Sequence, residues 1–166
     1  MGHHAVSDPK QNKTIENYRH IVTNQAIVSL AWEPKSGLIF GGSGNWGGGG
    51  TKPVEKEATF FGFDPKTKQK VFEAALVPGA RSYPATLAAE GKVFTTVGSS
   101  LCVFDPKSKA VRSTIRLPGE QVEISLGRHK SGKLVGLAGG AVYALDPLKE
   151  EILFIEKAPV PVKCGF

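Results

Sequence analysis

The chain has 166 residues, of which 40% are hydrophobic and 22% charged, and its formal net charge is +6. This balance is typical of a folded domain with a buried core and excludes a disordered chain. No apolar run approaches the roughly 20 residues of a membrane-spanning helix, and the N-terminal region lacks the apolar segment of a secretory signal. We therefore expect neither a membrane segment nor a targeting signal.

The N-terminal residues 1–17 are polar, and the opening letters MGHH resemble a cloning remnant. We expect residues 1–17 to be a leader outside the fold, and residues 18–166 to form the folded part. The run NYRHIVT at 17–23 is rich in strand-forming residues. It predicts a single strand in the position of a preceding unit's last strand.

Four strand-like runs then follow one another in a fixed order, three times over. Each run is short, rich in Val, Ile, Thr and aromatic residues, and nearly always ends at Gly, Pro or Asp. The runs lie at 26–32, 37–42, 59–65 and 69–79, then at 84–89, 91–98, 100–106 and 110–119, and finally at 122–127, 132–139, 141–147 and 151–160. The pattern predicts an all-β chain built from an internal repeat.

The third run of each unit ends in Asp-Pro, with the aspartates Asp64, Asp105 and Asp146 spaced 41 residues apart. An aspartate side chain accepts a hydrogen bond from the backbone two residues on, and proline presets the first central position of a type I turn. The third strand of each unit therefore folds back onto the fourth as an antiparallel hairpin.

Four antiparallel strands in a unit of about 40 to 45 residues are the pattern of a β-propeller blade. We predict an all-β fold of three four-stranded antiparallel blades in an incomplete ring, with blades at about 26–79, 80–119 and 120–160. A closed propeller needs about four to eight blades. The run VKCGF at 162–166 predicts the first strand of a further blade.

The first unit is 13 residues longer than the second. The excess lies in the polar, glycine-rich stretch GSGNWGGGGTKPVEK between its second and third runs. We expect residues 43–57 to form an inserted flexible loop.

The turn of the first unit partly matches a sequence pattern of a known repeat family. In D-x-x-T-G-x-x-x-W, Asp64 and Thr67 match, whereas Lys68 replaces the glycine and Phe72 the tryptophan. On these residues the chain, over about 18–166, resembles the bacterial propeller repeats described as YVTN-like or quinoprotein-like. The resemblance implies a propeller fold. Pyrroloquinoline quinone belongs only to the family's dehydrogenases, whose cofactor and calcium residues have no match here, so we expect no cofactor.

The positive charge is concentrated in the turns of the repeat rather than on one face. A nucleic-acid surface would interleave arginines and aromatic residues along a face, so we expect solvated turns and no nucleic-acid partner. The two cysteines, Cys102 and Cys164, lie in apolar stretches. We predict that both are core residues. The four histidines show no ligand spacing beyond the His3–His4 pair, and we predict no metal site.

The blade connections and the loops between second and third strands gather on one face of a propeller, and we expect any ligand to bind there. Trp46 is of special interest because the glycines beside it offer few apolar side chains for it to pack against, which favours a role in a contact surface. No nucleophile–base pair is visible, so we predict no catalytic residue. The candidate binding residues are Asn24, Gln25, Asn45, Trp46, Arg81, Tyr83, Glu120 and Gln121.

The leading interpretation is a noncatalytic binding or scaffold segment of a propeller protein, with a small molecule, a glycan or a protein as partner. The alternative is a part of a propeller enzyme, a lyase or a glycan-active protein, whose active site needs further blades. Nucleic-acid binding is the third and least supported class. Open blade edges also predict self-association.

Overall fold

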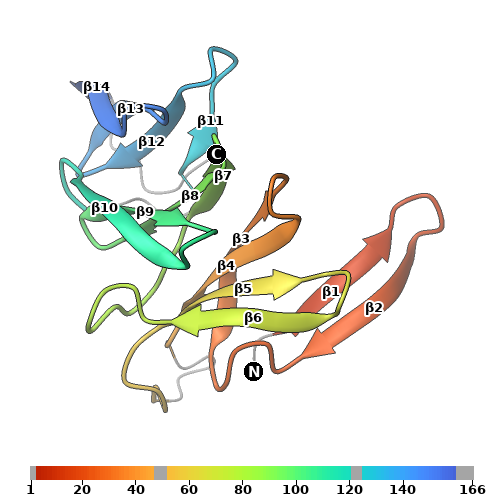
Figure 1. Cartoon of the computed structure of the whole chain (residues 1–166). Helices are drawn as coiled ribbons and strands as arrows, with labels where there is room; N and C mark the ends of the chain where they lie inside the picture. The colour runs from red at the N-terminus through yellow and green to blue at the C-terminus, as the bar shows by residue number, and fades with distance from the viewer. Residues whose placement is uncertain (1–2, 47–51, 121–124, 160–166) are drawn as a thin grey trace.

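The structure is a computed structural model of the chain, and it describes residues 3–46, 52–120 and 125–159. All the regular secondary structure in these ranges is β-strand (Figure 1). In the same ranges we find no helix that could cross a membrane. The prediction of an all-β chain is confirmed.

Three four-stranded antiparallel sheets follow one another along the chain, each with its strands in sequence order (Figure 1). Each sheet corresponds to one predicted unit. The first sheet contains β3 (Ala26–Glu33), β4 (Leu38–Gly44), β5 (Phe60–Asp64) and β6 (Gln69–Ala74). The second contains β7 (Thr86–Ala89), β8 (Lys92–Val97), β9 (Ser100–Asp105) and β10 (Ala110–Arg116). The third contains β11 (Gly127–Arg128), β12 (Leu134–Ala138), β13 (Ala141–Asp146) and β14 (Glu151–Lys157).

The sheets pack face to face through apolar clusters. Phe104 of the second sheet lies among Phe40, Phe60 and Phe72 of the first, with ring centroids 5.5, 5.2 and 5.0 Å away. A second cluster, which includes Phe94 and Tyr143, joins the second sheet to the third. Cys102 is buried in the first of these clusters, as predicted for a core residue. Burial of this apolar surface is the main force that holds the sheets together.

The Asp-Pro turns form as the sequence predicts. Each turn aspartate accepts a hydrogen bond from the backbone nitrogen two residues on, and the residue four positions on has a left-handed backbone. The hydrogen bonds run from Lys66 to Asp64 (2.8 Å), from Lys107 to Asp105 (2.8 Å) and from Leu148 to Asp146 (2.9 Å). The left-handed residues are Lys68, Lys109 and Glu150, with φ of 60°, 54° and 61°.

Residues 3–19 do not form the leader that we expected. They fold into an antiparallel hairpin of β1 (His3–Asp8) and β2 (Lys13–Arg19). Its turn repeats the others, because the Lys10 nitrogen donates to Asp8 at 2.8 Å and Asn12 has φ of 48°. The polar composition of residues 1–17 hid this fourth Asp-Pro turn.

The hairpin is anchored at its base. Tyr18 packs against Phe63 of the first sheet at 4.9 Å between ring centroids, and the segment after β2 buries Ile21 and Val22 in the same cluster. The strand predicted at 17–23 therefore ends at Arg19, and the chain turns inward to reach the first sheet.

Two other boundaries differ from the predictions. Strand β4 runs to Gly44, so the insertion begins after it rather than inside it. In the third sheet the first strand was expected at 122–127, but among the described residues it is β11, Gly127–Arg128, that pairs with β12. Residues 121–124 and the strand predicted at 162–166, which includes Cys164, lie outside the described residues.

Polar contacts at the outer rim tie each sheet to the one before it. Lys68 pairs with Glu16 of the hairpin, and the Lys109 side chain donates to the Val71 carbonyl oxygen at 3.1 Å. Glu150 accepts from Ser113 at 2.5 Å. In each case the side chain at the left-handed turn position reaches the fourth strand of the preceding unit.

The turn carboxylates make the fold sensitive to acid. The Lys107 backbone nitrogen donates to Asp105 and holds the pKa of that carboxyl below its usual value. A carboxyl with a lower pKa in the folded than in the unfolded chain stabilises the fold above the unfolded-state pKa, and this contribution is lost as pH falls through the folded-state pKa. We expect the melting temperature to fall below about pH 4. Asp105→Asn, which keeps the turn acceptor, should flatten this decline in a pH series of thermal melts; identical declines in both proteins would contradict the assignment.

Candidate functional site

The blade connections and the loops after the second strands meet on one face of the molecule. The Asn45 nitrogen donates to the Arg81 carbonyl oxygen at 3.0 Å, and the Leu117 nitrogen donates to Ser99 at 2.9 Å. In the third unit the Gly139 nitrogen donates to Glu120 at 3.0 Å. These backbone bonds hold one connection against one loop in each unit.

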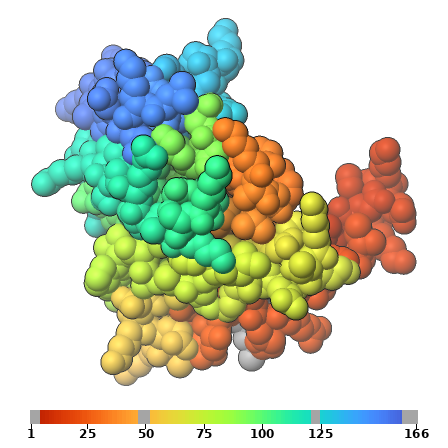
Figure 2. Space-filling view, in the orientation of Figure 1, coloured from red at the N-terminus to blue at the C-terminus, as the bar shows by residue number. Residues whose placement is uncertain are grey.

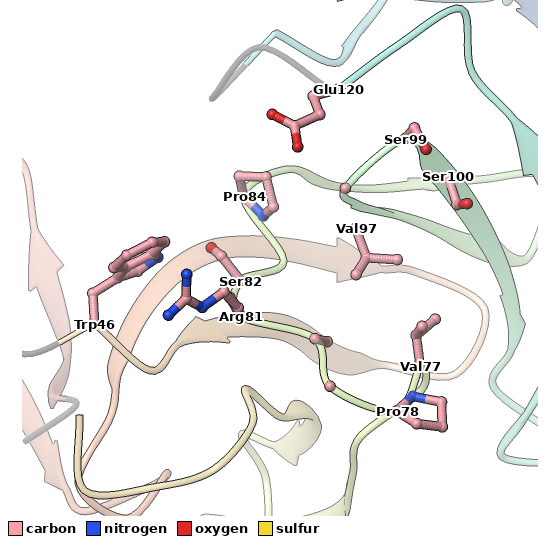
Figure 3. A pocket seen from close by; sticks show the side chains of 13 residues that line it. Trp46, Val77, Pro78, Arg81, Ser82, Pro84, Val97, Ser99, Ser100 and Glu120 are labelled. Carbon is pink, nitrogen blue, oxygen red and sulfur yellow. The ribbon is translucent and has the colours of Figure 1, made fainter.

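A pocket of about 530 Å³ opens on this face, between the first and second sheets (Figure 3). We call it the connection pocket. One wall is the β6–β7 connection, and another is the turn between β8 and β9. Its lining includes Trp46, Val77, Pro78, Arg81, Ser82, Pro84, Val97, Ser99, Ser100 and Glu120.

Trp46 and Arg81 form the rim of the connection pocket. The Arg81 guanidinium carbon lies 4.7 Å from the centroid of the Trp46 ring, and both side chains stand at the same edge (Figure 3). This stacking is a cation–π contact. Trp46 nevertheless keeps 58% of its surface exposed. Arg81 makes no ion pair with any residue that the structure describes, so its charge is available to a ligand.

Tyr83 lies beneath the face and not on it. Its side chain is fully buried, and its hydroxyl oxygen accepts hydrogen bonds from the backbone nitrogens of Leu76 (2.8 Å) and Val77 (3.3 Å). Burial raises the pKa of this phenol. Tyr83 therefore shapes the connection that forms the pocket wall and is not placed to touch a ligand.

Gln25 and Asn45 also lie below the surface, where loop carbonyl groups accept hydrogen bonds from their amide nitrogens. The Gln25 amide donates to the Glu57 carbonyl at 3.0 Å, and its oxygen accepts from Ser43 and from the Thr59 nitrogen. The Asn45 amide donates to two loop carbonyls at 3.2 Å. Both residues fix the path of the insertion.

The remaining predicted residues are spread over the face. Asn24 is exposed, but it donates to Glu55 at 2.9 Å and is not part of the connection pocket. Glu120 lines the pocket beyond Pro84 (Figure 3), and Gln121 lies outside the described residues. Of the eight predicted residues, the structure brings Trp46, Arg81 and Glu120 together.

Apolar and hydroxyl groups complete the connection pocket and were not predicted as binding residues. Val77, Pro78 and Val97 supply apolar wall, and Ser99 and Ser100 supply hydroxyls. The Gly98-Ser99 pair marks a tight turn in the sequence, but a turn signal does not reveal which connection it faces. The lining thus combines one cation, one anion, hydroxyl groups and apolar surface, which suits noncovalent recognition.

Among residues 3–46, 52–120 and 125–159, no cluster of three or more His, Cys, Asp and Glu side chains is placed to hold a metal ion.

Comparison with known proteins supports the fold only. No family model matches the chain, and no curated protein is similar to it in sequence. The crystal structure of the RRP9 WD40 repeats is similar, with a TM-score of 0.62 and 11% identity over 82% of this chain and 40% of that one. The structure of U3-55K has a TM-score of 0.62 and 11% identity over 82% and 41%. A protein of unknown function from Bacteroides caccae has a TM-score of 0.61 and 13% identity over 97% and 56%.

The chain spans between 40% and 56% of the length of these three proteins. Together with the three four-stranded antiparallel sheets, the similarity to WD40 repeats confirms the predicted fold class. The chain is a segment of β-propeller blades in a ring that is not closed.

Proposed function

We propose that this chain is a noncatalytic binding segment of a β-propeller protein and that it holds a segment of a protein partner in the connection pocket. The observation that carries the proposal is the pairing of Trp46 with Arg81 at the rim of a pocket shared by two blades. Tryptophan and arginine are the residue types that most often dominate the free energy of protein association.

The composition of the connection pocket favours a peptide over a glycan or a small molecule. A sugar ring would need an open aromatic face, and the Arg81 guanidinium lies over the Trp46 ring. An extended peptide offers apolar side chains for Val77 and Val97, polar groups for the serines, and an acidic group for Arg81. A glycan, a small molecule, or a role in a propeller enzyme completed by further blades are alternative outcomes.

The repeat type and the domain limits are part of the same proposal. Asp64 and Thr67 support a bacterial repeat of the YVTN-like or quinoprotein-like kind. We extend the propeller segment to include residues 3–17, because the hairpin has the same strand register and the same bulge as the outer two strands of the first sheet. Self-association through open blade edges remains a proposal for the isolated chain.

The proposal predicts which single side chain a bound peptide needs. The probe is a displayed library of random linear peptides, selected on the whole chain and then measured as synthetic peptides by calorimetry. We expect Trp46→Ala to weaken a selected peptide about tenfold or more, because a half-exposed rim tryptophan adds contact area without supporting the core. Its melting temperature should stay close to that of the parent.

Trp32→Ala is the matched control. Trp32 is 52% exposed, similar to Trp46, but lies on β3 outside the connection pocket, so this change should leave affinity unaltered. Equal binding by the parent and Trp46→Ala, or failure to select any peptide, would contradict the proposal. Binding of an oligosaccharide panel at Trp46 instead would replace the protein partner with a glycan.

A further inference from the structure

Another pocket, of about 310 Å³, lies where the N-terminal hairpin meets the first sheet, and we call it the joint pocket. Figure 2 shows the hairpin projecting from the body of the molecule beside the first sheet. Part of the lining comes from β2 and the residues after it, and part from β5, β6 and the turn between them. The lining residues are Asn17, Tyr18, Arg19, His20, Ile21, Phe63, Lys68 and Lys70.

Positive charge dominates the lining of the joint pocket. Arg19, Lys68 and Lys70 are cationic side chains, and His20 adds an imidazole ring that can be protonated. Among the described residues, no aspartate or glutamate lines this pocket. The joint pocket therefore favours an anion, in contrast to the connection pocket with its one cation and one anion.

The two lysines keep hydrogen-bond donors for a ligand. Lys68 pairs with Glu16, whereas Lys70 pairs with Glu73 and also donates to the Ile21 carbonyl oxygen at 2.8 Å. Because an ammonium group has three donors, two remain on Lys68 and one on Lys70. The existing contacts also hold both ammonium groups in place, which reduces the entropy lost when a ligand binds.

The carboxylates of Glu16 and Glu73 do not compete strongly with an anion. Both lie outside the lining of the joint pocket, and both are partly exposed to solvent. Exposed ion pairs of this kind contribute little stability. A phosphate group, which carries about two negative charges at neutral pH, should attract the lysines more strongly than either carboxylate does.

Arg19 is the cation best placed to select the anion. It is the last residue of β2 and is exposed, and its side chain forms no ion pair with any residue in the described ranges. A guanidinium group binds two oxygens of a phosphate at once, through parallel N–H donors. Arg19 approaches from the hairpin, whereas the lysines belong to the first sheet, so one ligand can contact both parts.

We propose that the joint pocket binds a phosphate group, held by the Arg19 guanidinium and by the ammonium groups of Lys68 and Lys70. The bound group bridges the hairpin and the first sheet. Phosphate is favoured over a carboxylate because it has a larger charge and three acceptor oxygens for donors from three side chains. The joint pocket is separate from the connection pocket, so the inference does not depend on the proposed peptide site.

Phosphorus NMR titrations of the whole chain test the site, with inorganic phosphate and glycerol 2-phosphate as probes. Arg19→Gln should weaken both probes about fivefold or more, because it removes the bidentate donor. Its melting temperature should stay close to that of the parent, since the side chain is exposed. Equal affinities would identify free phosphate as a sufficient ligand, and tighter binding of glycerol 2-phosphate would identify a phosphate ester; either result supports the proposal.

Lys66→Gln is the matched control. Lys66 lies in the same turn as Lys68 but does not line the joint pocket, and its replacement changes the net charge by the same amount as Arg19→Gln. It should leave both affinities unchanged. An equal loss in the two variants would mean general attraction to a basic surface and would overturn the proposal. Absence of saturable binding, or displacement of phosphate by an equal concentration of succinate, would also overturn it.

Hydrogen exchange tests whether the ligand bridges the hairpin and the first sheet. Because the phosphate group contacts both, saturating phosphate should slow amide exchange in β2 about threefold or more. Exchange in β14, the outermost strand of the third sheet, should not change. Equal slowing in β2 and β14 would indicate a general salt effect, and unchanged exchange in β2 would show that the ligand does not bridge the two parts; either result would contradict the assigned contacts.

Discussion

Replacing Phe104 with alanine is expected to lower the free energy of unfolding by about 3–5 kcal/mol, the usual cost of removing a buried phenylalanine. The side chain is completely buried and contacts three aromatic rings of the neighbouring sheet, Phe40, Phe60 and Phe72. Its loss would leave a cavity between the first two sheets. Chemical denaturation followed by circular dichroism measures the effect.

Phe154→Ala is the control for this prediction. Phe154 lies on the outermost strand of the third sheet and is 49% exposed, so its truncation should change the free energy of unfolding by about 0.5 kcal/mol or less. If the two substitutions cost the same, the interface between the first two sheets would not be the stabilising core that the structure indicates.

The order of the strands in the three sheets was predictable because the repeat marks it in several ways at once. Asp64, Asp105 and Asp146 each place the turn between a third and a fourth strand, and strand-forming residues lie on both sides. Where strand-forming residues were the single signal, the predicted strand bounds were less accurate. The first strand of the third unit pairs only at Gly127 and Arg128 in the described residues, although strand-forming residues precede them.

The hairpin was missed for a physical reason. Its strands lack the buried apolar alternation on which strand prediction depends, since most of their side chains are exposed. What determines this hairpin is the turn at Asp8 and the contact of Tyr18 with Phe63. The Asp8-Pro9 pair was visible in the sequence, but its distance from Asp64 differs from the 41-residue repeat.

The candidate site was only partly predictable, because the sequence does not reveal the burial of polar residues in loops. Gln25, in a blade connection, and Asn45, in the insertion, were predicted as binding residues, yet their amide nitrogens donate to loop carbonyl groups below the surface. Trp46 and Arg81 could be named individually. Their stacking depends on the pairing of Gly44 with Ser82, a contact between two units that no local pattern encodes.

Replacing Gly42 with alanine is expected to damage both the fold and the connection pocket. A Cβ atom at Gly42 would overlap the Tyr83 Cβ and lie 2.5 Å from the Tyr83 carbonyl oxygen. Backbone cannot move aside as a flexible side chain can, so β4 and the β6–β7 connection would separate. We expect the free energy of unfolding to fall by about 1–3 kcal/mol, the range for overpacking a close contact.

Gly44→Ala on the same strand separates this steric effect from a general effect of the substitution. Its Cβ atom would meet Trp46 and Val28 side-chain atoms at 3.4 Å, which is ordinary contact, so stability should change by about 0.5 kcal/mol or less.

Gly42→Ala should also weaken any peptide selected on the connection pocket. The Tyr83 nitrogen donates to the Ser43 carbonyl at 3.0 Å, and this bond positions the neighbouring Arg81 and Ser82. Denaturation and calorimetry on the two variants measure both effects. Equal stability of the two would show that the connection is free to move away from β4, and the rim of the pocket would then not be held in place by this contact.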